Sequence, residues 1–492
     1  MAQPESAPSS IAILNVTVIS MEKEEALPGE TVRVEGGRIV AVGPTATVAI
    51  APSTVVVDGS GKFLIPGLAD MHVHLQRETS LEANKWFINL LLTNGITTIR
   101  NMWGIPEHLE LRRAIREGKM IGPTIYTAGP ILDGRPPMWQ GSVVVESAPE
   151  VEAALSQQQS AGYEFVKVYS QLSKDAYHAI FAGARARHLK VVGHVPLAVG
   201  IEEAIMAGQY SIEHLDGYIN AIETADSPVF GKTDWYSQMV GYGYIDQQKL
   251  DHLANLTRDA GTWNCPTLVT MSKWLSPEER DKLRHQQGTQ SVPDDVRKLW
   301  EIMSDRQLKS FSRLDMLKLR RAEKARSAIV RSLLQHGAKI VAGTDTPAPF
   351  VVPGVSLHEE LAKLVAAGLS PYQALRAATR DAAELLGQLD EFGTIAPGKR
   401  ADLVLLDADP LVRISNSTQI AGVMLQGRWF SRATLDHLFA NEFGRVPSPE
   451  LDGASSVIFK RPGYQYVHWN DPRSDGFVEN TTLPDSVARQ PR

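Results

Sequence analysis

Short apolar segments alternate with longer helical stretches through the middle of the chain, and this alternation constrains the fold more than any other feature. From Pro66-Gly67 onward we expect eight β-strands, with room for a helix between each strand and the next, near residues 68–75, 97–102, 124–128, 165–170, 191–195, 211–215, 263–269 and 340–344. Strands that alternate with helices in this way form parallel sheets. Eight such units predict an α/β fold of the (β/α)₈ TIM barrel type.

Both ends of the chain have β character of a different kind. Residues 11–19, 32–42 and 54–58 are short β-branched runs separated by Gly, Pro and Ser, and residues 393–430 return to the same pattern. The simplest architecture adds a small β-sandwich domain built from both chain ends. We therefore predict an N-terminal half of this domain (1–65), the barrel (66–388), the C-terminal half (389–431) and a C-terminal extension (432–492), loosely ordered from about residue 446.

Composition and charge exclude several classes of protein. The 492 residues are 43% hydrophobic and 22% charged, values typical of a soluble globular protein. A net charge of -6, with acidic and basic residues interspersed, argues against a nucleic-acid partner. No apolar run reaches the roughly 18 residues that cross a membrane, and no signal peptide is visible. We expect a cytoplasmic protein, although a trimmed secretory signal would leave the same start.

Cysteine usage narrows the metal chemistry. The single cysteine, Cys265, removes any intramolecular disulfide and any all-thiolate metal site, whereas 13 histidines remain. We interpret Cys265 as a buried structural residue, with a thiol in a pocket wall as the alternative.

Four histidines and an aspartate lie at the ends of predicted barrel strands. His72 and His74 end the first strand, and both face the barrel axis because side chains two apart on a strand point to the same side. His194 ends the fifth strand and His214 lies on the sixth. Asp345 ends the eighth, where a carboxylate is both a metal ligand and a candidate general base. Four converging imidazoles are hard to explain as packing, since each would need a buried hydrogen-bond partner.

Lys167 lies within an otherwise apolar and aromatic strand. A buried ammonium is costly unless it is neutralised or paired. One interpretation pairs it with a carboxylate such as Asp345. The other makes it a neutral amine that takes up carbon dioxide, so that the resulting carbamate bridges two cations.

Together these residues resemble the pattern of the amidohydrolase superfamily, over most of the chain up to Phe430. The segments GHVPLAVGIEEAIMAGQYSIEHL, GTDTPAP and LSPYQALRAAT look like the branch that contains imidazolonepropionase-like proteins, Xaa-Pro and Xaa-Arg dipeptidases, ochratoxin amidohydrolases and phenylurea hydrolases. The resemblance implies two divalent metal ions, most simply Zn²⁺. It assigns one ion to His72, His74 and Asp345, the other to His194 and His214, and the bridge to N6-carboxylysine at Lys167.

Two places depart from the dipeptidase members. Those proteins often carry a further His two residues after the fifth-strand ligand, and a Gly-Gly-His-Gly stretch after the third strand. Here these places read Pro196 and Gly129-Pro130-Ile131-Leu132. Side chains that would grip a dipeptide carboxylate are thus missing or moved, which weakens the dipeptidase assignment.

Aromatic side chains are expected to shape the mouth of the site. Trp103 follows the second strand, Trp139 lies in the Pro-rich loop after the third, and Tyr169 is close to Lys167. His358 begins the helix after the eighth-strand loop, where a substrate contact and a surface position both fit. A long, charge-rich helical insertion over about 276–337 also belongs to this end of the barrel. Aromatic walls favour an apolar or aromatic group in the substrate.

The predicted function is hydrolysis of an amide bond in a small molecule, which could be peptide-like, an N-acyl amino acid or an aryl amide. A metal-bridging hydroxide would attack the carbonyl and Asp345 would shuttle the proton. The same site could instead open cyclic amides or lactones, or cleave ureas, carbamates or esters. A non-catalytic barrel scaffold is disfavoured because every expected ligand is present. Relatives suggest a homo-oligomer.

Overall fold

Eight parallel strands form the barrel among the described residues, and each begins within one residue of its predicted start. The computed structural model describes residues 10–77, 81–275, 279–310 and 312–443. The barrel strands are β6 (Leu68–Val73), β7 (Ile96–Asn101), β8 (Thr124–Thr127), β11 (Phe165–Val168), β12 (Lys190–Gly193), β13 (Ser211–Glu213), β14 (Trp263–Cys265) and β15 (Lys339–Ile340). Strands β6 to β8 form one sheet and β11 to β15 another, together with β9 (Leu132–Asp133) and β10 (Val143–Val144). Parallel bridges Ala128↔Phe165 and Val73↔Thr346 join the two sheets at both edges. The predicted α/β barrel is confirmed.

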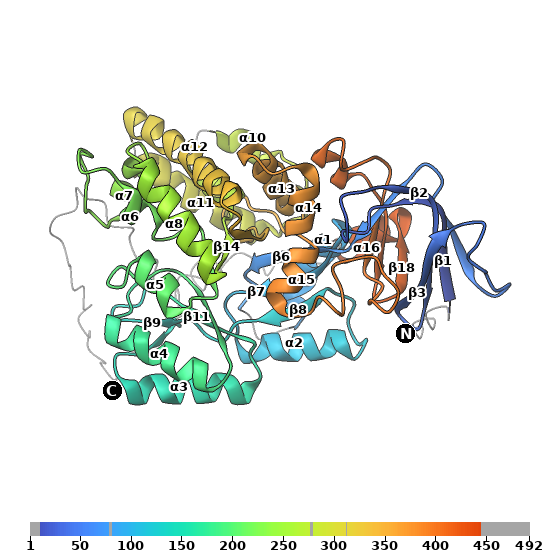
Figure 1. Cartoon of the computed structure of the whole chain (residues 1–492), viewed down its shortest axis with the longest axis horizontal. Helices are drawn as coiled ribbons and strands as arrows, with labels where there is room; N and C mark the ends of the chain where they lie inside the picture. The colour runs from blue at the N-terminus through green and yellow to red at the C-terminus, as the bar shows by residue number, and fades with distance from the viewer. Residues whose placement is uncertain (1–9, 78–80, 276–278, 311, 444–492) are drawn as a thin grey trace, which may run out of the picture.

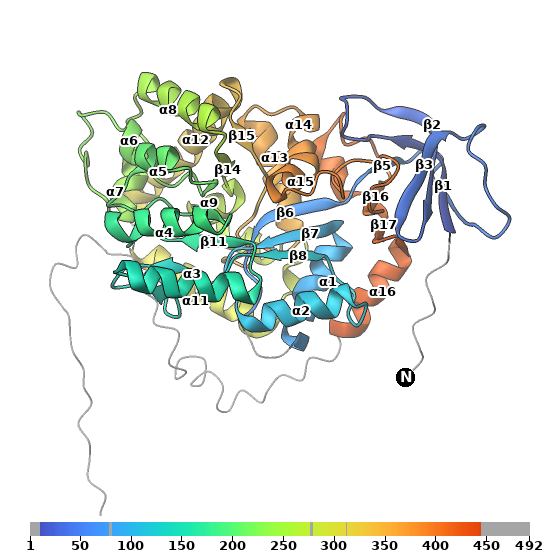
Figure 2. The same ribbon diagram turned by 60° about the horizontal axis from the view of Figure 1, so that its bottom comes forward.

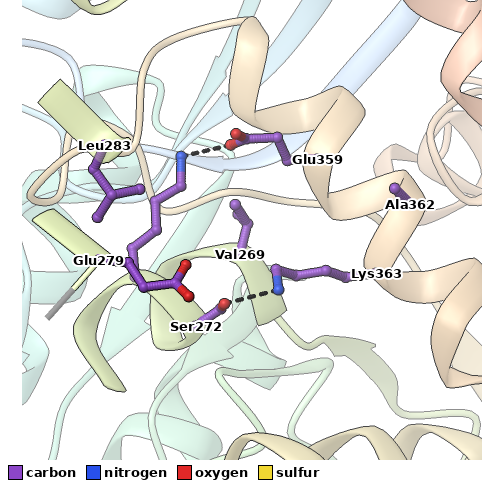
Figure 3. Close-up of a pocket in the computed structure, with 8 residues that line it drawn as sticks. Val269, Ser272, Glu279, Leu283, Glu359, Ala362 and Lys363 are labelled. Atoms are coloured by element: carbon purple, nitrogen blue, oxygen red, sulfur yellow. Dashed lines mark hydrogen bonds and ion pairs between the residues drawn. The ribbon is translucent and has the colours of Figure 1, made fainter. Parts of the chain in front are cut away.

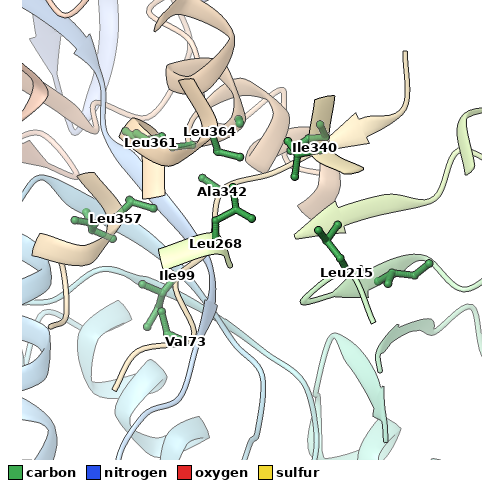
Figure 4. Close-up of a cluster of buried hydrophobic side chains, with 14 of the residues drawn as sticks. Val73, Ile99, Leu215, Leu268, Ile340, Ala342, Leu357, Leu361 and Leu364 are labelled. Atoms are coloured by element: carbon green, nitrogen blue, oxygen red, sulfur yellow. The ribbon is translucent and has the colours of Figure 1, made fainter. Parts of the chain in front are cut away.

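Helices surround these strands (Figures 1 and 2). They are α1 (Lys85–Thr93), α2 (Pro106–Arg116), α3 (Ala148–Ala161), α4 (Lys174–Ala186), α5 (Ile201–Ala207), α6 (Tyr218–Ile222), α7 (Trp235–Gly241), α8 (Gln247–Ala260), α13 (Val355–Ala367), α14 (Pro371–Ala377) and α15 (Arg380–Leu386). Apolar side chains of these helices are buried in the core. Figure 4 shows Leu357, Leu361 and Leu364 of α13 in one buried cluster with Val73 and Ile99 of the barrel strands. Burial of this apolar surface holds the strand ends in place.

The insertion before the eighth strand is helical, as predicted. It contains α10 (Arg280–Arg284), α11 (Asp294–Ser310) and α12 (Arg313–Gln335), and α9 (Leu268–Leu275) precedes it. Trp300 of α11 is 1% exposed and its indole Nε1 donates to the Pro347 carbonyl at 3.0 Å. The insertion therefore packs onto the loop that follows the eighth strand.

Two predicted strands are shorter than expected. The seventh ends at Cys265 instead of Val269, because Thr267 adopts a left-handed backbone (φ 46°) and α9 begins at Leu268. The eighth is assigned only over Lys339–Ile340. Beyond it the chain continues as an extended segment held by single hydrogen bonds, such as Met71 N–H to the Ala342 carbonyl at 3.0 Å.

The two chain ends build one small β domain, as predicted. Its strands are β1 (Ser10–Val18), β2 (Leu27–Glu35), β3 (Arg38–Pro44), β4 (Val55–Asp58), β5 (Phe63–Pro66), β16 (Leu403–Leu406), β17 (Ile420–Leu425) and β18 (Arg428–Ser431). All eight belong to one hydrogen-bonded sheet, in which N-terminal β5 pairs antiparallel with C-terminal β16. Figure 1 shows this domain at one end of the molecule, beside the barrel.

The C-terminal extension is described only in part. Helix α16 (Arg432–Phe443) follows the last strand of the small domain. The segment for which we predict loose order, from about residue 446, lies outside the described residues. The three boundaries between the four predicted segments stay predictions. Among the helices that the structure describes, none is long and apolar enough to cross a membrane.

Candidate active site

The first predicted ligand group comes together at the C-terminal end of the barrel. Oδ1 of Asp345 lies 3.0 Å from His74 Nε2 and 3.4 Å from His72 Nε2. Asp345 is held there in a left-handed backbone conformation (φ 62°), and its N–H donates to the His72 carbonyl at 2.7 Å. The ligand atoms of these three residues lie within 4.8 Å of one another, which is close enough to hold a metal ion.

His194 and His214 lie beside this group, directly after β12 and β13. The ring centroids of His72 and His214 are 4.6 Å apart, and those of His194 and His214 are 4.9 Å apart. The four imidazoles predicted from the sequence thus form one continuous cluster. His194 and His214 are the pair that the family resemblance assigns to a second ion.

Lys167 is buried within β11, at 1% exposure. Gly193 on the neighbouring strand makes room for it, because a Cβ there would lie 3.0 Å from Lys167 Cδ and 2.3 Å from the Val168 carbonyl oxygen. Burial lowers the pKa of Lys167 to about 8, although Glu213 and Asp345 oppose the shift. Among the described residues no carboxylate forms an ion pair with Lys167 within 4.0 Å. The interpretation that pairs it with Asp345 is therefore not supported.

Three histidines are oriented through Nδ1. His72 Nδ1 lies 2.7 Å from Glu213 Oε2, His214 Nδ1 lies 2.7 Å from Thr267 Oγ1, and His194 Nδ1 lies 3.3 Å from Asp216 Oδ2. Outer partners of this kind fix the tautomer and leave Nε2 for a metal. His72 Nε2 is buried and has no hydrogen-bond partner among the residues that the structure describes. Burial also lowers the pKa of His72 and of His214 well below the usual value, which favours the neutral imidazole that metals bind. The residues present therefore fit a divalent metal ion.

Glu213 and Arg100 are functional residues that the sequence analysis missed. Both side chains are fully buried, and Arg100 Nη2 donates to Glu213 Oε1 at 2.9 Å. Arg100 Nε also donates to the Met71 carbonyl at 2.6 Å, so the pair connects β13 to the strand that carries His72. Arg100 holds the pKa of Glu213 below its ordinary value against the effect of burial. The sequence feature that could have identified these two residues is a charged side chain within a predicted barrel strand. The same feature identified Lys167.

Asp70 ties the first strand to the last. Its carboxylate accepts the His72 N–H at 3.1 Å, the Thr344 N–H at 3.0 Å and the Thr344 hydroxyl at 2.7 Å. These bonds fix the main chain on both sides of the His72–Asp345 contact. Asp70 therefore supports the site without pointing into it.

Gly343 is required by close packing rather than by its backbone angles. A Cβ at this position would lie 2.4 Å from Cys265 Sγ and 2.8 Å from the His72 nitrogen. We expect Gly343→Ala to lower stability by about 1–3 kcal/mol, as overpacking does, and to weaken metal binding because His72 must move. Urea unfolding and metal content measure the two effects. Gly43→Ala is the matched control, since its Cβ meets nothing closer than 3.5 Å. Equal behaviour of both variants would contradict the prediction.

Cys265 is completely buried, in agreement with its interpretation as a structural residue. Burial raises the pKa of its thiol well above the usual value. Its Sγ nevertheless lies within 4.8 Å of ligand atoms of His72 and Glu213. The thiol forms part of the wall behind the histidine cluster.

Three of the four predicted substrate residues form a connected aromatic wall. Tyr169 stacks on His194 with ring centroids 3.9 Å apart and accepts a hydrogen bond from Trp139 Nε1 at 2.7 Å. Trp103 lies next in line, 6.4 Å from Trp139 between centroids, and Arg77 covers its ring at 4.0 Å. The wall thus runs from a candidate metal ligand to the exposed Arg77.

His358, the fourth predicted substrate residue, is placed differently. It is 5% exposed, and its two ring nitrogens lie 2.8 Å from Ser417 Oγ and 3.0 Å from the Asn94 carbonyl. Both nitrogens are therefore used within the protein, in an apolar layer between α13 and the small domain. We assign His358 no part in substrate binding.

A separate cavity of about 340 Å³ lies between α9 and α13 (Figure 3). The two lysines that line it are paired: Lys363 Nζ lies 3.0 Å from Glu323 Oε1, and Lys273 donates to Glu359 Oε2 at 2.5 Å. The residues that line it include none of the six predicted ligands.

The fold and the site together define a barrel with candidate metal-binding residues at the C-terminal ends of its strands. The chain belongs to the amidohydrolase family, whose model matches residues 63–430.

Solved structures and curated relatives agree with this family. Bottromycin amidohydrolase superposes with a TM-score of 0.72 at 25% identity, over 89% of this chain and 90% of that one. Ochratoxinase from A. niger superposes with a TM-score of 0.62 at 20% identity, over 87% and 96%. Adenine deaminase 3 of Rhizobium meliloti (strain 1021) is 23% identical over 81% of this chain and 55% of its own length. The matches to adenine deaminases span from 11% to 57% of those relatives' lengths.

Proposed function

We propose that this protein is a metal-dependent amidohydrolase that cleaves the amide bond of a small molecule. The observation that carries the proposal is the convergence of four imidazoles, the Asp345 carboxylate and the buried Lys167 amine at one end of the barrel. In barrels of this type the C-terminal strand ends carry the active site. The family and its amidohydrolase neighbours support hydrolysis of a carbon-nitrogen bond.

The chain offers ligands for two divalent ions, for which Zn²⁺ is the simplest candidate. His72, His74 and Asp345 would hold one ion, and His194 and His214 the other. The neutral amine of Lys167 would add to carbon dioxide, forming an N–C bond and releasing a proton, and the resulting carbamate would bridge the ions. Among the described residues no carboxylate forms an ion pair with this buried lysine within 4.0 Å, and this supports that assignment. When bound, the ions would polarise the scissile carbonyl and lower the pKa of a water molecule.

Asp345 is the proton shuttle in this proposal. Its side chain is 22% exposed, and its Oδ1 lies 3.0 Å from His74 Nε2 and 3.4 Å from His72 Nε2. It would accept the proton of the attacking water and donate it to the nitrogen of the leaving amine. Without that proton the amine is a poor leaving group, so one carboxylate serves both halves of the reaction.

The aromatic wall favours a substrate with an apolar or aromatic group next to the amide. Tyr169, Trp139 and Trp103 present stacked or tilted rings that lead away from His194. N-acyl amino acids with aromatic acyl groups, peptide-like compounds and aryl amides all match this surface. The homo-oligomeric state and the cytoplasmic location stay predictions.

A substrate panel tests the proposal. Metal-loaded protein is incubated with N-acyl amino acids, dipeptides, aryl amides, aryl ureas, lactones and adenine, with the Lys167→Ala variant as blank. We expect release of amine from an aromatic amide by the wild-type protein, and a loss of at least about 100-fold in the blank. Equal rates in both proteins, or hydrolysis confined to lactones and esters, would contradict it.

A further inference from the structure

A charged side chain from the insertion is buried against the site. Arg326 lies in α12, is 2% exposed, and forms no ion pair with any carboxylate among the described residues. Its Nη2 donates to the carbonyls of His214 and Pro266, and its Nη1 donates to the Tyr242 hydroxyl at 3.0 Å. Burial of a guanidinium with only neutral acceptors is costly. A contribution to folding stability therefore does not by itself explain why Arg326 is buried at this position.

The main chain that Arg326 contacts is strained. His214 and Leu215 adopt consecutive left-handed conformations, with φ of 60° and 54°, and Thr267 follows with φ of 46°. Each such residue costs roughly 1–3 kcal/mol and persists only where its surroundings hold it. The two carbonyls that accept from Nη2 belong to the turns after β13 and β14. Arg326 therefore ties together the two turns that direct His214 and its partner Thr267.

A second buried charge fixes the same segment from the other side. Glu360 of α13 is fully buried and accepts the Leu268 N–H at 3.0 Å and the Val269 N–H at 2.7 Å. These two amides directly follow Thr267, whose hydroxyl contacts His214 Nδ1 at 2.7 Å. The segment from Pro266 to Val269 is thus held by a cation at one end and by a carboxylate at the other.

We propose that Arg326 is a positioning residue that sets the orientation of the His214 imidazole. Through the His214 carbonyl it fixes the main chain of the candidate ligand, and through Pro266 it fixes the turn that presents Thr267 to the ring. The insertion helix α12 is then a structural part of the metal centre, and not only a cover over it. This inference rests on the proposed function, because it assumes that His214 binds a metal ion.

The test follows the release of metal rather than activity. Wild-type protein, Arg326→Met and Arg331→Met are loaded with Zn²⁺ and challenged with a chromogenic chelator. Arg331 is the matched control, since it lies on the same helix, is exposed, and donates to the Ala367 carbonyl at 3.1 Å. We expect Arg326→Met to bind one of its ions about 10–100-fold more weakly, the effect typical of losing an outer partner of a metal ligand. Arg331→Met should behave like the wild-type protein.

Two further variants keep the test decisive. If Arg326→Met does not fold, the same measurement is made on Arg326→Lys. A lysine ammonium can reach one of the two carbonyls but cannot connect the turns after β13 and β14 as the guanidinium does. Tyr242→Phe removes one acceptor and leaves both carbonyl contacts, so its metal release should change less than about threefold. Melting curves confirm that each variant is folded. Wild-type metal retention by folded Arg326→Met or Arg326→Lys would overturn the inference. A wild-type protein that binds no divalent ion would instead overturn the proposed function.

Discussion

Replacing Asp345 by Asn is expected to lower kcat by about 10²–10⁴-fold and to leave the metal content near that of the wild-type protein. Removal of a positioned general acid and base has effects of this size. The asparagine keeps an oxygen 3.0 Å from His74 and keeps the main-chain bond to the His72 carbonyl, so the geometry of the ligand group survives. It cannot take a proton from water or return one to the leaving amine.

Steady-state kinetics and metal analysis on the same preparation check this prediction. Asp407→Asn is the control, because that carboxylate is exposed and pairs with Lys62 on the small domain, so the substitution should leave kcat unchanged. Full activity in Asp345→Asn would remove the proton shuttle from the mechanism. A large loss of metal would show instead that Asp345 acts mainly as a ligand.

Glu213→Gln should have the largest effect on stability, a loss of about 3–5 kcal/mol. The carboxylate is completely buried, and its removal leaves the equally buried Arg100 guanidinium without a counter-charge. It also weakens the hydrogen bond that orients His72 through Nδ1. The variant should therefore unfold at lower urea concentration and lose metal more readily.

The control for the stability loss in Glu213→Gln is a substitution in an exposed ion pair. Glu391 pairs with Arg38 at 2.9 Å, but the two side chains are 44% and 51% exposed. Pairs in water contribute about 0–1 kcal/mol, so Glu391→Gln should be almost neutral. The double variant Arg100→Met/Glu213→Leu should recover much of the loss, since it leaves no buried charge unpaired. Equal destabilisation by Glu213→Gln and Glu391→Gln would contradict this account.

The order of elements and the six candidate ligands could be predicted from the sequence because each has a local signal. Strand periodicity locates the barrel, and His72 or Lys167 is conspicuous as a polar residue at the end of, or within, an apolar run. The parallel arrangement then forces these ends to one side of the barrel.

The outer partners have no comparable signal, because they depend on distant contacts. Glu360 caps the start of α9 from 92 residues away in the sequence and so helps to end the seventh strand at Cys265, where local pattern predicted Val269. His358 looked free on its helix, yet Ser417 of the small domain occupies its Nδ1. Such contacts depend on how whole helices and domains pack against one another. Local sequence patterns carry no information about that packing.

In the proposed function this barrel holds divalent metal ions through Lys167 and through histidines from three of its strands. The most direct test is metal analysis by mass spectrometry on protein reconstituted with Zn²⁺ in bicarbonate buffer and freed of excess ion. We expect about two ions per chain in the wild-type protein, and fewer in Lys167→Ala, which lacks the bridging group. A folded wild-type protein with no bound divalent ion would contradict the account.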